Sequence, residues 1–286
     1  MDESHITVVS TEPEAEDRAA ALAGMLSVTH TDILSTEGDP QTRYRFRLLV
    51  DSHTTRLEWH DPSPGTLTLS FTEGRNRYRM QAGGRRRDTL ARAIGLGKHA
   101  TRRDITNHSI LDATAGLCRD AWAMAAYGCP VIAFERSGWL NWMQRDALTQ
   151  ALADPDTHDC ASRLTLVRSD ATNWLNDWLT HTNSKDVQSR KVSAIYLDPM
   201  YPQRKKSAAV KKDMQVLHQL IGADTDSEKL LTAALSAARQ GLIDRVVVKR
   251  PASGDTLDNP WQVKPTHTHE SKNTRYDVYM GQSLKF

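Results

Sequence analysis

The chain has 286 residues, enough for one large domain or for a catalytic domain with a smaller appendage. Its hydrophobic content of 39% and charged content of 25% are typical of globular proteins, and no apolar run approaches the roughly 20 residues that span a bilayer. Three widely spaced cysteines and an acidic N-terminal stretch without an apolar segment exclude a disulfide framework and a secretory signal, so we expect a cytoplasmic protein with no membrane partner.

The net charge of +2 hides an uneven distribution of charge along the sequence. Residues 1–40 carry many acids and one arginine, Arg18, whereas arginine dominates from residue 41 to residue 103, and a second basic run spans residues 204–212. Such clusters suit a polyanion like RNA, although solvated faces that balance an acidic segment would also explain them. The residues expected to contact RNA are Arg85, Arg86, Arg87, Arg204, Lys205, Lys206, Lys211, Lys212, Lys249 and Arg250.

Residues 1–84 are expected to form a small α/β unit that contributes to RNA binding. A helix is predicted from Glu14 to Met25, and alternating apolar residues predict strands at residues 44–48, 57–59 and 67–71. The pair Gly83-Gly84 marks a plausible boundary to the next unit.

Residues 85–286 show short apolar strands that alternate with helices, the pattern of a mostly parallel sheet covered by helices on both faces. The predicted strands are 110–111, 131–134, 164–167, 192–197 and 245–248. The predicted helices are 88–94, 119–127, 139–153, one that runs through Trp174 and Leu179, and 228–240. The last segments, 262–267 and 276–280, are expected to form an antiparallel pair. A sheet of this kind binds its ligand beyond the carboxyl ends of its strands.

The first of these strands ends in Asp112, which is followed by small residues up to Gly116 and then by Arg119 and Asp120 at the start of a helix. Small residues permit a tight turn close to a ligand, and the helix presents free N–H groups there. A tight turn without any ligand would explain this segment nearly as well.

The second strand ends in Glu135, at close to the ~20-residue distance from Asp112 at which an acid meets a ribose diol in nucleotide-binding folds. One carboxylate can accept hydrogen bonds from both hydroxyl groups. Ser169 and Asp170 close the third strand on the same side of the sheet. These acids predict a nucleotide-like cofactor at this edge.

The most specific motif, Asp198-Pro199-Met200-Tyr201-Pro202, follows the fourth strand. It resembles the Asp/Asn-Pro-Pro-Tyr/Phe signature of amino methyltransferases, with Met200 in place of the second proline. Asp198 and the Pro199 carbonyl could hold the N–H groups of a planar amine, and Tyr201 offers a face for an extruded base. The alternative is a proline-rich turn with a tyrosine in the core. No third ligand accompanies the pair His267 and His269, so no metal is expected.

Together, these segments are similar to the family of ribosomal RNA small subunit methyltransferase J over roughly residues 80–280. The resemblance implies a class I methyltransferase fold, Rossmann-like, with a mostly parallel seven-stranded sheet, an antiparallel C-terminal hairpin and a small N-terminal α/β domain. It implies that S-adenosylmethionine (SAM) methylates N2 of one guanine near the 3′ end of 16S rRNA, free or in the small ribosomal subunit. It places catalysis at Asp198, Pro199 and Tyr201. The cofactor contacts it implies are Asp112, Gly116, Arg119, Asp120, Glu135, Arg136, Ser169, Asp170 and Asp198. Cys118 stands where the family has glycine.

Three other functions stay open on the sequence alone. An amino methyltransferase could act on another base or on a protein glutamine. A dinucleotide-dependent dehydrogenase would share the strand–turn–acid pattern, but it leaves the motif at Asp198 without a task. A non-catalytic RNA-binding protein would explain the arginines but not the acids at the strand ends. The sequence does not indicate an oligomeric state.

Overall fold

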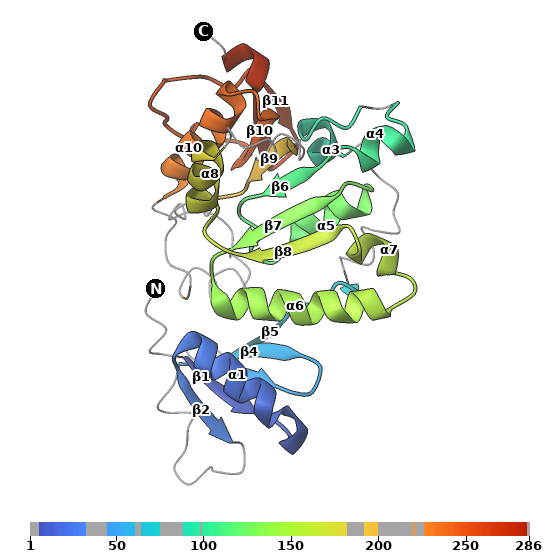
Figure 1. Cartoon of the computed structure of the whole chain (residues 1–286), viewed down its shortest axis with the longest axis vertical. Helices are drawn as coiled ribbons and strands as arrows, with labels where there is room; N and C mark the ends of the chain where they lie inside the picture. Colours follow the sequence, from blue (N-terminus) through green and yellow to red (C-terminus); the bar gives the residue numbers. More distant parts are fainter. Residues whose placement is uncertain are drawn as a thin grey trace.

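The computed structural model describes residues 6–32, 45–60, 64–74, 88–97, 99–181, 192–199, 220 and 226–284. Within these ranges the chain forms two sheets, one of five strands and one of seven. The two sheets lie toward opposite ends of the molecule, and the long helix α6 (Gly138–Ala153) runs between them (Figure 1).

The five-stranded sheet is built by the N-terminal part of the chain, in the order β2-β1-β3-β4-β5. Its strands are β1 (Ile6–Ser10), β2 (Thr29–Asp32), β3 (Phe46–Val50), β4 (Thr55–Trp59) and β5 (Gly65–Thr68). Strand β1 pairs in parallel with β2 and β3, and β3, β4 and β5 form an antiparallel meander. A short 3-10 turn (Pro13–Ala15) leads into helix α1 (Glu16–Leu26), which contacts β1 and β2.

The sequence predicted α1, β3 and β4 but missed β1 and β2. In β3 every second residue is buried, which is the alternation that the prediction used. All five residues of β1 are buried, so the strand shows no alternation, and β2 is made of polar residues. The strand predicted at 67–71 ends earlier, at Thr68.

The seven-stranded sheet has the order β11-β12-β10-β9-β6-β7-β8. Its strands are β6 (Ile110–Asp112), β7 (Val131–Glu135), β8 (Leu164–Arg168), β9 (Val192–Leu197), β10 (Ile243–Pro251), β11 (His267–Glu270) and β12 (Thr274–Met280). The pairs among β6 to β10 are parallel, and β12 runs antiparallel to both β10 and β11. The predicted mostly parallel sheet with an antiparallel C-terminal hairpin is confirmed.

Helices cover both faces of this sheet (Figure 1). They are α3 (Thr89–Ala93), α4 (Arg102–Thr106), α5 (Arg119–Ala126), α6, α7 (His158–Ala161), α8 (Ala171–Thr180) and α10 (Ser227–Arg239), with a final 3-10 turn (Gly281–Leu284). Residues along a strand alternate between two cores, because side chains of a strand point to opposite faces. Val131 and Ala133 pack with α5, whereas Ile132 and Phe134 pack on the side of α8 and α10.

The C-terminal hairpin differs from the prediction in one strand. Strand β11 begins at His267, where the segment 262–267 was expected to end. Gln262 has a left-handed backbone with φ of +50°, and the Asn259 side chain both donates to the Val263 carbonyl and accepts from its N–H. This closed loop prevents residues 262 and 263 from extending the strand.

Helix α6 is the element that joins the two sheets. Its residues Trp139, Leu140 and Met143 belong to the core of the N-terminal unit, which includes Leu22 of α1 and Leu57 of β4, the two elements of that unit that α6 contacts. Phe71, which follows β5, stacks on Trp122 of α5, with ring centroids 4.5 Å apart. The division at residue 84 stays a prediction, since Gly84 lies outside the described residues.

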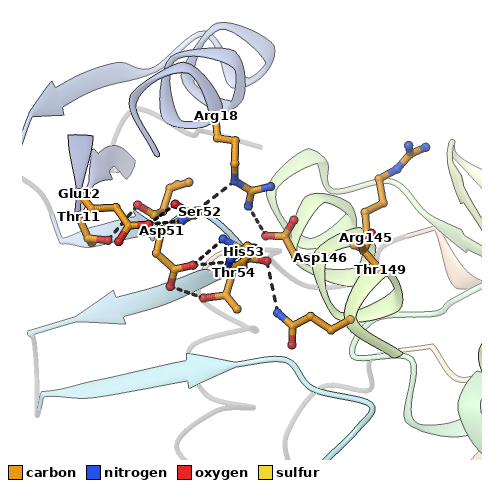
Figure 2. A network of polar contacts seen from close by, with 12 residues as sticks. Thr11, Glu12, Arg18, Asp51, Ser52, His53, Thr54, Arg145, Asp146 and Thr149 are labelled. Atoms are coloured by element: carbon orange, nitrogen blue, oxygen red, sulfur yellow. Dashed lines mark hydrogen bonds and ion pairs between the residues drawn. The ribbon is translucent and has the colours of Figure 1, made fainter. Parts of the chain in front are cut away.

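Polar contacts add to this junction (Figure 2). Arg18 of α1 donates to the Asp146 carboxylate of α6 at 2.9 Å and to the Asp51 carbonyl at 3.1 Å. The Gln150 side chain of α6 donates to the His53 carbonyl at 3.3 Å. Asp146 is only 9% exposed, and burial raises its pKa, which the Arg18 bond opposes. The charge of Asp146 therefore depends on Arg18.

No helix in the described part of the chain is both long and apolar enough to cross a membrane.

We expect Arg18→Met to lower the free energy of unfolding by about 1–3 kcal/mol, because it leaves a buried carboxylate without its cation. Urea denaturation followed by tryptophan fluorescence measures this change. The double variant Arg18→Met/Asp146→Leu should recover most of the loss, and Arg103→Met, at an exposed arginine of α4, serves as the control. An Arg18→Met protein as stable as the wild type would contradict this role.

Candidate functional site

A cavity opens where β6, β7, β8 and β9 end, beside the start of α5 and α10. Its wall includes every residue that the sequence predicted for the cofactor: Asp112, Gly116, Arg119, Asp120, Glu135, Arg136, Ser169, Asp170 and Asp198. They come together because the parallel strands all end at one edge of the sheet. The structure confirms their proximity, and their roles stay a prediction.

The turn after β6 is shaped by backbone bonds. The Thr114 N–H donates to Asp112 Oδ1 at 3.0 Å, and the Ala115 N–H donates to the Phe134 carbonyl of β7 at 3.0 Å. Gly116 adopts φ of +51°, the left-handed region in which a Cβ is strained. Position 116 therefore requires glycine, or a residue that the surrounding contacts hold in the left-handed conformation.

Glu135 at the end of β7 accepts a hydrogen bond on each carboxylate oxygen. The Gly116 N–H donates to Oε2 at 3.0 Å, and the Ser137 N–H donates to Oε1 at 2.7 Å. Burial raises the pKa of Glu135, while these two backbone bonds lower it. A carboxylate has about four acceptor positions, so these bonds do not exhaust its capacity to accept from hydroxyl groups of a ligand in the cavity.

A single lysine joins two acids in the cavity wall. Lys249 Nζ lies 2.6 Å from Asp120 Oδ2 and 2.7 Å from Asp198 Oδ2. Burial lowers the pKa of Lys249, but the charges of Asp198 and Asp120 raise it more, so it stays well above its ordinary value. The Tyr196 hydroxyl also donates to Asp120, at 2.7 Å. These bonds fix the carboxylates with their charges partly balanced.

Asp112 lies behind this pair and is 2% exposed. Burial raises its pKa to about 8, with further increases from the charges of Asp120 and Asp198 and a decrease from the Thr114 N–H. At neutral pH, Asp112 is therefore largely protonated in the cavity as it stands.

Asp198 and Pro199 lie where β9 ends, and the cavity wall includes Asp198. The Asp198 N–H donates to the Thr114 hydroxyl at 2.6 Å, which ties the end of β9 to the turn after β6. Burial raises the pKa of Asp198, whereas Lys249 lowers it. Tyr201 lies outside the described residues, as do the basic residues Arg85, Arg86, Arg87, Arg204, Lys205, Lys206, Lys211 and Lys212.

Of the two RNA contacts expected at the end of β10, Arg250 is buried, whereas the contact expected of Lys249 stays a prediction. Arg250 is only 5% exposed, so its side chain is not on the surface where it was predicted to meet phosphates. Lys249 faces into the cavity, where two carboxylates hold it. Neighbouring residues of a strand point to opposite faces, so the two side chains could not share one surface.

Cys118 replaces the expected glycine without filling the cavity. Its backbone has φ of +52°, the conformation that glycine would adopt, and its side chain is fully buried in the core against α5 and β7. Burial raises the pKa of its thiol well above the ordinary value, so the sulfur stays protonated.

Sequence reasoning missed several residues of the cavity wall, among them Thr114, Tyr196, Asp226 and Leu230. Arg136 lies 3.9 Å from Asp170 and 3.7 Å from Asp226, which connects the strand ends to the start of α10. Asp226 follows no strand, so nothing in the sequence marked it. In the described part of the chain, no cluster of His, Cys, Asp and Glu is arranged to hold a metal ion.

Known proteins share this architecture. The family model for SAM-dependent methyltransferases matches residues 34–281. The ribosomal RNA small subunit methyltransferase J of Thioalkalivibrio sulfidiphilus is 36% identical over 281 residues, which cover 98% of this chain and 99% of the relative. The protein of the same name from Nitrosococcus oceani is 42% identical over 226 residues, with 79% and 81% covered. A solved SAM-dependent methyltransferase from Neisseria gonorrhoeae has a TM-score of 0.66 and 26% identity, with 98% and 99% covered.

The raised pKa of Asp112 predicts how stability depends on pH. Between the ordinary pKa of an aspartate, near 4, and about 8, the folded protein holds a proton that the unfolded chain has released. This group's contribution to stability therefore falls as the pH rises through that window. Thermal unfolding should show Asp112→Asn more stable than the wild type at pH 8.5 and close to it at pH 4. An Asp112→Asn protein that differs from the wild type in melting temperature by the same amount at pH 4 and at pH 8.5 would contradict the raised pKa of Asp112.

Proposed function

The chain belongs to the SAM-dependent methyltransferase family, and we propose that it methylates the exocyclic N2 of a guanine in small-subunit ribosomal RNA. It is an enzyme with a class I methyltransferase fold, and S-adenosylmethionine is its cofactor. Family membership leaves no support for the dehydrogenase or the non-catalytic RNA-binding protein. The observation that carries the proposed reaction is that Asp198 ends β9 in the same cavity wall as Glu135.

The cavity offers groups that fit the cofactor. When bound, S-adenosylmethionine supplies a methyl group already activated by a positively charged sulfur. The free acceptor positions of Glu135 suit the ribose hydroxyls, and Ser169 and Asp170 suit the adenine amino group. Arg119 and Asp120, at the start of α5, offer opposite charges for the amino acid end of the cofactor.

Asp198 and Pro199 would hold the amine that receives the methyl group. The lone pair of an exocyclic amine is delocalised into the base, so the amine is a weak nucleophile. The Asp198 carboxylate and the Pro199 carbonyl would accept its two N–H groups and favour a more tetrahedral nitrogen. The bond from the Asp198 N–H to Thr114 fixes the backbone from which both acceptors extend.

Lys249 would keep Asp198 ready for this role. An ionised carboxylate only accepts hydrogen bonds, whereas protonation turns one of its oxygens into a donor. Burial favours the protonated form of Asp198, and the ammonium group 2.7 Å away favours the ionised form. Asp198 would also take the proton that the nitrogen releases after methylation.

The RNA side of the proposal rests on the relatives and on charge. The predicted contacts in residues 85–87 and 204–212 would bind phosphates, and Tyr201 would stack on the flipped guanine. The substrate would be 16S rRNA or the small ribosomal subunit, which places the enzyme in the cytoplasm.

Mass spectrometry of 16S rRNA fragments, from cells with and without the gene, tests the function. The expected result is the loss of one N2-methylguanine, restored when the gene is returned. An unchanged rRNA would contradict the proposed substrate and direct the search to another base or to a protein glutamine.

Asp198→Ala should lower kcat for methylation of unmodified 16S rRNA by about 100-fold or more, because it removes the side-chain acceptor that would hold the amine. Transfer of a radiolabelled methyl group to the RNA measures the rate. The control is Asp177→Ala, at an exposed aspartate of α8, which should keep the wild-type rate. Full activity of Asp198→Ala would exclude Asp198 from catalysis.

Lys249→Met should move the acidic limb of the pH–rate profile to higher pH, because without the ammonium the pKa of Asp198 rises further. Lys249→Arg keeps the charge and should largely retain the wild-type profile. A profile of Lys249→Met that is lower at every pH but not displaced would contradict this role.

A further inference from the structure

Two amide side chains are buried in α6 where the helix passes the turn after β6. Gln144 is 0% exposed and Asn141 is 2% exposed. A buried amide without hydrogen-bond partners costs free energy, so such residues are retained where their partners are fixed. The sequence alone gave no reason to single out either residue.

The partner of Gln144 is the backbone of the turn. Its Nε2 donates to the Gly116 carbonyl at 2.6 Å. Its Oε1 accepts from Asn141 Nδ2 at 3.3 Å, and Asn141 Oδ1 in turn accepts from Arg145 Nε at 3.1 Å. Hydrogen bonds through Asn141 and Gln144 therefore connect the exposed Arg145 to Gly116 in the cavity wall.

Gly116 is consequently held at both of its polar groups. Glu135 accepts from its N–H, and Gln144 donates to its carbonyl. Because a peptide unit is planar, fixing the Gly116 carbonyl also fixes the N–H of Leu117, whose residue lines the cavity. Gln144 itself is not part of the cavity wall.

The N-terminal unit holds the helix that carries Gln144. Trp139, Leu140 and Met143 are buried in the core of that unit, and Arg18 binds Asp146 (Figure 2). These contacts involve residues of α6 on both sides of Gln144 in the sequence. The position of the Gln144 amide therefore depends on how α6 packs against the N-terminal unit.

We propose that Gln144 is a positioning residue for the cofactor, which fixes the Gly116–Leu117 peptide without touching S-adenosylmethionine. The N-terminal unit then serves the reaction by holding α6, and with it this amide, against the turn. The assignment rests on the proposed function of the turn as a cofactor contact.

The variant Gln144→Met keeps the length of the side chain and removes the donor. Calorimetry on the purified full-length protein should show the Kd for S-adenosylmethionine raised about tenfold, as expected for a buried carbonyl left without its donor. In steady-state assays the KM for S-adenosylmethionine should rise while the KM for 16S rRNA stays unchanged.

The matched control is Gln240→Met, at an exposed glutamine that ends α10 and is not part of α6 or of the cavity wall. It should bind S-adenosylmethionine like the wild type. If Gln144→Met does not fold, Asn141→Ala removes the donor to Gln144 Oε1, together with the acceptor for Arg145, and should raise the Kd about threefold.

A folded Gln144→Met protein with wild-type affinity for S-adenosylmethionine, whatever its melting temperature, would overturn the proposal. If Gln144→Met does not fold, wild-type affinity in Asn141→Ala would do the same. A wild-type protein that binds the cofactor but leaves 16S rRNA unmethylated would contradict the proposed function instead, and the binding comparison would stand.

Discussion

The hydrogen bond from the Gly116 N–H to the Glu135 carboxylate is the contact on which the site depends. It closes the left-handed turn after β6 against the end of β7, the neighbouring parallel strand. The same carboxylate faces the cavity, so one side chain both shapes the turn and presents acceptors to the cavity, where the proposal places the ribose. The geometry of the turn and the chemistry of the pocket therefore cannot vary independently.

The second constraint is charge. Asp112, Asp120 and Asp198 line one cavity with Lys249, and Asp120 and Asp198 share its single ammonium group. Burial of Asp112 is unfavourable for its charged form and raises its pKa to about 8. S-adenosylmethionine carries a positive sulfur, an ammonium group and a carboxylate, and two carboxylates beside one ammonium group favour a ligand with this net positive charge. The arrangement that costs stability is thus suited to the cofactor.

The fold and the strand-end acids could be predicted because both follow local rules. Short apolar strands between helices predict a parallel sheet, and its strand ends converge on one edge. The strand β1 was missed because it is buried throughout and shows no alternation. Neighbouring side chains of β10 point to opposite faces of the sheet, so the side chain of Arg250 points away from the cavity that Lys249 faces. The sequence did not indicate which of the two faces the cavity. The role of Gln144 could not be predicted, because a glutamine in a helix is expected to be exposed to solvent. Its hydrogen bond to the Gly116 carbonyl is visible only in the structure.

Cys118 shows that the turn is imposed by its surroundings and not by glycine alone. A non-glycine residue in the left-handed region costs roughly 1–2 kcal/mol. Burial of a small apolar side chain returns about the same amount, and the Cys118 side chain is fully buried in the core. The Cys118 N–H also donates to the Ala115 carbonyl at 2.7 Å, and Glu135 and Gln144 hold Gly116, two residues earlier. With the backbone fixed by these bonds and the side chain packed away from the cavity, cysteine replaces glycine without adding a side chain to the cavity wall.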